Sequence, residues 1–245
     1  MLANWARPRI HYAWIIAGVT FLTLIAAAGM RSTPGVIIVP LQHEFGWSLA
    51  DISLAVSINL LLFGLCGPFA AAFMDRFGMR RVMIAALVMV ACAAAATTLM
   101  RELWQLYLLW GGLVGLATGS MASVLAAMVA NRWFVERRGV VTGVLTAAGA
   151  TGQLIFLPLL ATLTVNINWR AASFTTAGAA VLVAVVVALV MRDRPRDVGL
   201  QPYGAAPDAP DAVASVANPV TAALGGLARG LRSRNFWLLG GSFFI

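Results

Sequence analysis

Long, uninterrupted runs of apolar residues dominate this chain, and its charged positions gather in short clusters between them. Six runs are long enough to cross a bilayer core about 30 Å thick, which takes roughly 20 residues of α-helix. They cover residues 12–39, 52–74, 82–100, 103–129, 140–163 and 169–191. Membrane strands would instead show alternating patterns of about ten residues. The pattern therefore predicts an all-α membrane protein with six spans.

The chain changes character after the sixth run. Residues 193–219 are rich in Pro, Ala and Asp, a composition that cannot bury a core of its own and is typical of a linker. A further apolar run opens at residue 236 and has about ten residues, half of what a span needs. We therefore expect a six-helix bundle (1–191), a cytoplasmic linker (192–235) and the start of a seventh membrane helix (236–245), with a second bundle missing.

Composition and charge support a membrane protein and exclude several other classes. Hydrophobic residues make up 61% of the 245 positions and charged residues only 11%, far from the balance of a soluble domain.

All 17 basic residues are arginine, and the net charge is +8. Nucleic-acid binding is disfavoured because the arginines form no single basic face. They lie mostly on one side of the predicted spans, which places the N-terminus and the linker in the cytoplasm. Abundant Ala and Arg without Lys indicate a bacterial source, hence an inner (plasma) membrane.

The connection between the second and third runs carries an acid, a glycine and three arginines in a tight turn: Asp75, Arg76, Gly78, Arg80 and Arg81. The carboxylate can accept from an arginine or a helix N-terminus, and the glycine permits the turn. Alternatively, the arginines serve only as anchors on the cytoplasmic side.

The order Asp-Arg-x-Gly-x-Arg-Arg resembles the signature between helices two and three of the major facilitator superfamily. Ala71 stands where that signature usually has its first glycine, and Met79 where a basic residue is common. The resemblance implies the six-helix N-terminal half of a major facilitator fold, related internally as an inverted three-plus-three repeat, although no sequence repeat is readable. It also implies that this loop is a cytoplasmic gate whose acid contacts a helix of the second half.

The segment 130–139, followed by Gly143, Gly149, Gly152 and Pro158, is similar to the start of helix five in monocarboxylate porters and related oxalate/formate antiporters. Residues 192–202 and 234–237 suit the central loop and helix seven of bacterial members. The Asp-Gly-rich start of helix one typical of animal monocarboxylate transporters is missing. Arg132, from this segment, is assigned to the same gate.

Arg31 is the only charge well inside a predicted span. A buried arginine is costly and normally faces a water-filled cavity, a partner or an anionic ligand. Its planar fork suits a carboxylate, and Pro34 favours a locally opened helix beside it. Alternatively, the side chain snorkels to the outer surface. Asn59 and Gln153 are further candidates, which either bond to a neighbouring helix or line the central cavity.

Glycines recur at every fourth position of two runs: Gly111, Gly115 and Gly119 in the fourth, and Gly139 and Gly143 in the fifth. Small residues at this spacing let helix backbones approach closely. The alternative is a role in rocking or in lining the substrate path, which is compatible with packing.

These features favour a secondary active transporter of small organic anions, resembling monocarboxylate carriers, that works by alternating access. Transport of a drug or sugar is the alternative within the fold, and a non-transporting membrane sensor or scaffold is the alternative outside it.

An intramembrane enzyme is disfavoured because no HExxH, GxSxG or histidine lies within a span. No metal or cofactor is expected. Because no Asp or Glu lies near the centre of a span, a coupling proton would bind in the second half or to the substrate.

Overall fold

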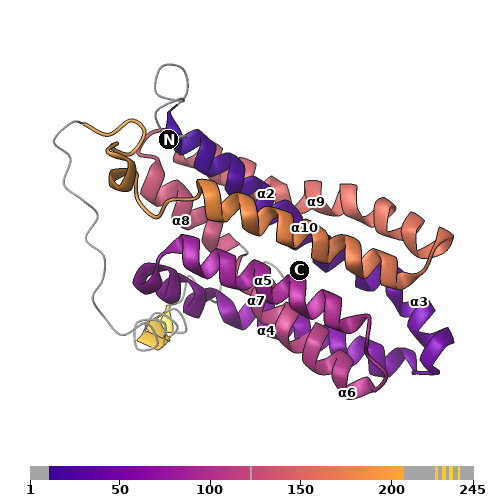
Figure 1. The fold of residues 1–245 in the computed structure, drawn as a ribbon. Helices are drawn as coiled ribbons and strands as arrows, with labels where there is room; N and C mark the ends of the chain where they lie inside the picture. Colours follow the sequence, from indigo (N-terminus) through magenta and orange to yellow (C-terminus); the bar gives the residue numbers. More distant parts are fainter. Residues whose placement is uncertain are drawn as a thin grey trace.

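The computed structural model describes residues 11–121 and 123–206, and the isolated positions 224, 225, 228, 229, 232, 233 and 237. Most of the expected linker after residue 206, and the seventh span apart from Trp237, lie outside the described residues. The described elements are helical: α2 (Tyr12–Ser32), α3 (Pro34–Phe45), α4 (Leu49–Phe77), α5 (Met79–Thr97), α6 (Leu103–Leu106), the π-helix η1 (Tyr107–Val114), α7 (Gly115–Ser120), α8 (Ser123–Trp133), α9 (Arg138–Asn166), α10 (Trp169–Val190) and the 3-10 helix η2 (Pro195–Val198). Figure 1 shows them as one elongated bundle.

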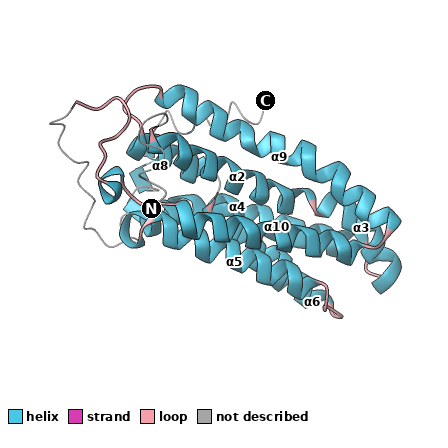
Figure 2. Ribbon diagram, turned by 45° about the horizontal axis from the view of Figure 1, so that its top comes forward, coloured by secondary structure: helices cyan, strands magenta, loops and turns pink. Residues whose placement is uncertain are grey.

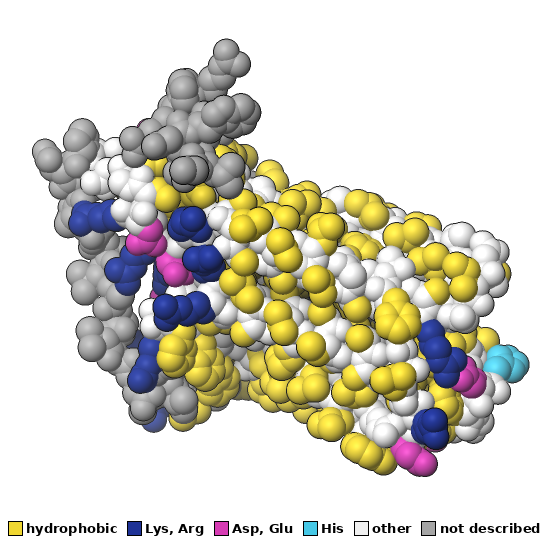
Figure 3. Space-filling model, viewed as in Figure 1, with side chains coloured by type: hydrophobic (Ala, Val, Ile, Leu, Met, Phe, Trp, Pro, Cys, Tyr) yellow, Lys and Arg dark blue, Asp and Glu magenta, His cyan; other side chains and the backbone are white. Residues whose placement is uncertain are grey.

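Among the described residues, six helical units are long and apolar enough to cross a membrane, which confirms the six predicted spans. The units are Tyr12–Phe45, Leu49–Phe77, Met79–Thr97, Leu103–Trp133, Arg138–Asn166 and Trp169–Val190. Charged side chains gather toward the two ends of the bundle, and a mostly apolar belt lies between them (Figure 3). We call the end formed by residues 75–81, 132–138 and 192–196 the arginine-rich end.

The first span remains helical past Pro34, contrary to the expected local opening. Thr33 separates α2 from α3 but keeps helical dihedral angles, φ −57° and ψ −43°. Its backbone N–H donates to the carbonyl of Met30 at 3.2 Å, and its hydroxyl donates to the carbonyl of Gly29 at 3.3 Å. Because a proline is tolerated in the first turn of a helix, Pro34 begins α3 without unwinding the chain.

The fourth span is not the single regular helix that its apolar pattern predicts. It passes from α6 through the π-helix η1 into α7 and then α8. The amide nitrogen of Asn59, on α4, donates to the carbonyl of Trp110 in η1 at 2.8 Å. A buried side-chain amide thus bonds a backbone carbonyl within the irregular turn.

The pairing of the spans follows a three-plus-three repeat (Figures 1 and 2). The first span packs along the fifth (α2 with α9), and the fourth packs along the second (η1 and α7 with α4). The third span packs on the sixth (α5 with α10), the sixth on the first, and the third on the fourth. We exchange span one with four, two with five, and three with six. The pairing of one and five then becomes that of four and two, and the pairing of six and one becomes that of three and four, while the pairing of three and six is unchanged. Equivalent spans are three positions apart, and because successive spans cross the membrane in opposite directions, equivalent spans are antiparallel and the repeat is inverted.

Three glycines of the fourth span lie directly against the backbone of α4. A Cβ atom added to Gly111 would lie 3.1 Å from the carbonyl oxygen of Ala55, and one on Gly119 would lie 2.8 Å from the Cα of Phe63. A Cβ on Gly115 would lie 2.9 Å from the carbonyl oxygen of Asn59. Only glycine permits helices to approach so closely here.

Gly139 and Gly143 do not lie at a close helix contact within the described residues, contrary to the packing role expected of them. Both are exposed on the first turns of α9, and a Cβ on either would meet no described atom within 4 Å. The close contact of α9 with α2 occurs deeper, where a Cβ on Gly152 would lie 2.8 Å from the carbonyl oxygen of Ile25. Gly29 makes room in the same interface for the ring of Phe156.

We expect Gly119→Ala to lower the stability of the bundle by about 1–3 kcal/mol, because the added methyl group overpacks the contact with α4. Gly143→Ala is the matched control and should be neutral or stabilising by up to about 1 kcal/mol, since alanine favours a helix and meets no neighbour. Thermal unfolding in detergent measures both. Equal unfolding midpoints for the two variants would contradict the assignment of Gly119 to a close helix contact.

Candidate functional site

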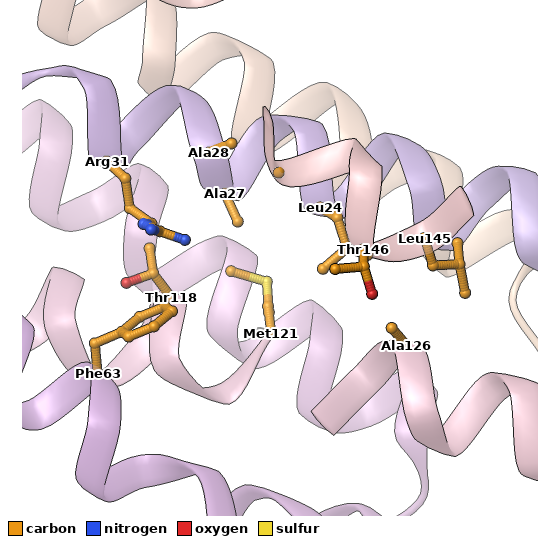
Figure 4. Close-up of a pocket in the computed structure, with 11 residues that line it drawn as sticks. Leu24, Ala27, Ala28, Arg31, Phe63, Thr118, Met121, Ala126, Leu145 and Thr146 are labelled. Atoms are coloured by element: carbon orange, nitrogen blue, oxygen red, sulfur yellow. The ribbon is translucent and has the colours of Figure 1, made fainter. Parts of the chain in front are cut away.

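A cavity of about 250 Å³ lies among the first, second, fourth and fifth spans. Figure 4 shows its lining residues, which come from α2, α4, α7, α8, α9 and the turn at Met121. The side chains and backbone that line it come from residues distant in the sequence: Leu24, Ala27, Ala28, Arg31, Phe63, Thr118, Met121, Ala126, Leu145, Thr146 and Gly149. Long-range packing of four spans therefore creates the cavity.

The cavity lies near mid-depth of the bundle. Phe63 is the middle residue of α4, which has 29 residues. Thr118 is the middle residue of the Leu103–Trp133 unit, and Gly149 lies three residues from the middle of α9. Three independent helices thus place the cavity about halfway between the two charged ends.

Arg31 is the charged group among the described residues that line this cavity. Its side chain extends from α2 toward Phe63 and Thr118 (Figure 4). The guanidinium carbon lies 4.7 Å from the centroid of the Phe63 ring. No ion pair or hydrogen bond reaches this guanidinium from the part of the chain that the structure describes. The side chain thus lies at mid-depth and does not snorkel to the end of the bundle.

The other polar groups of the lining are satisfied locally. The hydroxyl of Thr118 donates to the carbonyl of Val114 at 2.7 Å, and that of Thr146 donates to the carbonyl of Thr142 at 2.8 Å. Both bonds run to the preceding helical turn, which is usual for threonine in membrane helices. Because the remaining walls are largely apolar, the cavity offers one fixed positive charge in an apolar surrounding.

The two predicted amide candidates do not line this cavity. Asn59 is only 4% exposed and is engaged with η1. Gln153 is exposed on α9, one helical turn beyond Gly149, and is not among the lining residues. Of the three substrate-binding candidates, the structure therefore brings only Arg31 to the cavity.

Two charged residues of the arginine-rich end form an ion pair across the bundle. Asp75, at the end of α4, forms an ion pair with Arg132, at the end of α8. Arg76 lies over the ring of Phe77, 5.5 Å from its centroid, and Arg81 is exposed. The ion pair joins the end of α4, in the first three spans, to the end of α8, in the last three.

Asp193, just after α10, completes the tight turn before α5. Its carboxylate accepts from the backbone N–H of Arg80 at 2.8 Å, while the Arg80 guanidinium donates to the carbonyl of Ala188 in α10. Gly78 has φ +90°, and a Cβ there would lie 2.6 Å from an Asp193 oxygen. Gly78 thus provides both the backbone conformation and the space that this capping requires.

The first part of the expected linker is folded onto the bundle. The backbone N–H of Tyr203 donates to the carbonyl of Trp133, and that of Val135 donates to the carbonyl of Tyr203, both at 2.8 Å. The centroid of the Tyr203 ring lies 5.4 Å from that of the His11 ring and 5.8 Å from that of the Trp14 ring. Burial in this cluster lowers the pKa of the His11 imidazole. Residues up to 206 thus pack against the bundle, while the extent of the linker stays a prediction. The usable signals were Asp193 and Tyr203, the one aromatic residue of the run 193–219.

The opposite end carries an ion pair that sequence reasoning missed. The guanidinium of Arg170, on α10, binds both carboxylate oxygens of Glu44 on α3, and the indole N–H of Trp169 donates to the same carboxylate at 2.6 Å. Arg170 also donates to the carbonyl of Thr98 at 3.1 Å. These bonds tie the first, third and sixth spans together at that end.

Comparison with known proteins agrees with this architecture. The chain is 29% identical over 186 residues to monocarboxylate transporter 4 of mouse, a match that covers 76% of this chain and 39% of that protein. Rat monocarboxylate transporter 3 is 29% identical over 189 residues (77% of this chain, 38% of that protein). An uncharacterised MFS-type transporter of Bacillus subtilis, YcxA, is 24% identical over 184 residues (75% and 44%).

The chain spans less than half the length of these relatives. The profile of the Major Facilitator Superfamily matches residues 19–245, which is most of the chain. With six membrane-length helices in a three-plus-three arrangement, the chain is an integral membrane protein and belongs to the major facilitator superfamily.

Proposed function

We propose that this chain forms the N-terminal half of a secondary active transporter of small organic anions of the monocarboxylate class. The observation that carries the proposal is Arg31, an unpaired guanidinium at mid-depth that points into a cavity. Arg31 is exposed on this bundle by itself, and its charge becomes costly when a second bundle covers the cavity, until an anion neutralises it. The planar fork of arginine matches a carboxylate, to which it can donate two parallel hydrogen bonds.

The shape and charge of the cavity support a small ligand with one carboxylate. The cavity of about 250 Å³ has apolar walls and one cation, a poor match for a sugar, which needs many hydrogen-bonding partners. Several relatives carry the name monocarboxylate transporter, which favours the same class. In this proposal a second bundle closes over the cavity, and rocking of the two bundles exposes it to each side in turn.

The described part of the cavity has no acidic residue that could bind a coupling proton. No Asp or Glu is among its lining residues, so a coupled proton would bind in the second bundle or travel on the substrate. The positive-inside rule places the arginine-rich end in the cytoplasm, and we infer a bacterial inner membrane from the composition.

The cluster at the arginine-rich end is proposed as the cytoplasmic gate. Its members are Asp75, Arg76, Gly78, Arg80, Arg81 and Arg132. The ion pair between Asp75 and Arg132 holds helix ends of opposite repeats together, and Asp193 fixes the turn between α4 and α5. A loop fixed in this way offers a rigid surface against which a second bundle can close.

Substitution of Arg31 tests the substrate site. We expect Arg31→Gln to reduce uptake of labelled lactate into vesicles by about 10- to 150-fold, because charged hydrogen bonds contribute about 1.5–3 kcal/mol. Arg31→Lys should keep the charge but raise KM about tenfold, since an ammonium group cannot form the bidentate pair. Arg101→Lys, at an exposed position, is the control and should leave KM unchanged. The proposal fails if Arg31→Lys transports organic anions with unchanged affinity.

A double-mutant cycle tests the gate. Asp75→Asn and Arg132→Gln should each lower the maximal uptake rate several-fold, and the double variant should be no slower than the slower single variant, because either change breaks the same ion pair. Arg81→Gln, at an exposed residue without an ion pair among the described residues, should combine additively with Asp75→Asn. Purely additive losses for Asp75 and Arg132 would show that the ion pair has no part in transport.

A further inference from the structure

Phe63 faces the guanidinium of Arg31 across the cavity, from the opposite wall (Figure 4). We propose that Phe63 is a positioning residue, which holds Arg31 at mid-depth so that the anion site is formed before substrate arrives. This inference rests on the proposed function of Arg31 and extends it to a residue that has no charge and needs no contact with the anion.

Phe63 is suited to this role because its backbone is fixed. It is the middle residue of α4, and Gly119 on α7 packs directly against its Cα and carbonyl oxygen. The ring therefore projects from a rigid contact between two spans. Arg31, by contrast, lies near the end of α2, roughly 28 Å along the helix from Tyr12, on a long and flexible side chain.

An arginine at this position has a competing conformation. Its side chain can instead extend away from Phe63, toward the end of the bundle that carries Glu44 and Arg170. Snorkelling of this kind is common for arginine in membranes, because water solvates the charge there. A cation over an aromatic face is attracted by the ring quadrupole, most strongly where water is excluded. The 4.7 Å contact with Phe63 therefore favours the conformation that points into the cavity.

The contact with the ring leaves the anion-binding groups of Arg31 available. A guanidinium can rest its flat face on an aromatic ring while a carboxylate binds the N–H groups along its edge, in the plane of the group. In that arrangement the two interactions use different parts of Arg31 and can form together. Phe63 therefore raises the affinity for anions without occupying the position of the carboxylate.

The test compares Phe63→Leu, which removes the ring but keeps an apolar side chain, with Phe63→Tyr and Phe63→Trp, which keep a ring. The measurement is uptake of labelled lactate by vesicles containing the protein encoded by the complete gene. We expect Phe63→Leu to raise KM about 5- to 30-fold, equivalent to about 1–2 kcal/mol, with Vmax within about twofold of the wild type. The two aromatic variants should stay within about threefold of the wild-type KM.

A neutral ligand separates positioning of the charge from packing of the cavity. Lactamide has the size of lactate without its charge, so its inhibition constant should change less than about twofold in Phe63→Leu. Phe174→Leu is the matched control, the same change at an exposed position of α10 that does not line the cavity, and should leave the lactate KM unchanged. Thermal unfolding of each variant in detergent verifies that the bundle is intact.

The outcomes distinguish this inference from the proposed function. If Arg31→Gln abolishes uptake while Phe63→Leu leaves the lactate KM unchanged, Arg31 binds the anion and the positioning role of Phe63 is overturned. Equal increases in KM for the leucine and both aromatic variants would also overturn it, because the ring would then be irrelevant. If Arg31→Gln itself leaves uptake unchanged, the proposed anion site is wrong and the inference about Phe63 falls with it.

Discussion

A polar group at membrane depth must find its hydrogen-bonding partner inside the protein, and much of this structure follows from that constraint. The hydroxyls of Thr20, Thr23 and Thr118 donate to carbonyls of their own helix. The Asn59 amide reaches across to the backbone of η1, where the π-helical turn alters the regular bonding pattern. Arg31 differs from these groups, because its guanidinium lies over the Phe63 ring and has no hydrogen-bonding partner among the described residues.

Features encoded in single segments could be predicted from the sequence. Apolar run length gave six spans whose existence the structure confirms, because the bilayer sets a minimum length that no soluble helix needs. The Asp75 to Arg81 motif indicated the family, which the profile match confirms. Arg31 could be identified from the sequence alone, because it is a single charge within a long apolar run.

Features that depend on tertiary contact could not be predicted in the same way. The fourth-residue spacing is identical for Gly115 and Gly143, yet one lies against a helix backbone and the other is exposed. Spacing defines a face of a helix, but it does not say what that face meets. Similarly, the composition of residues 193–206 resembles a linker, and only the position of Tyr203 against His11 and Trp14 reveals that the segment is held.

The close helix packing and the cavity meet at one residue. Gly119 lets α7 approach the backbone of α4 at Phe63, and the ring of the same Phe63 contacts Arg31. A larger residue at position 119 would push α4 away and move that ring relative to α2. Packing and lining of the substrate path are therefore not competing interpretations of the glycines in the fourth span. The glycine contact determines where the ring stands, and the ring determines where the charge of Arg31 is held.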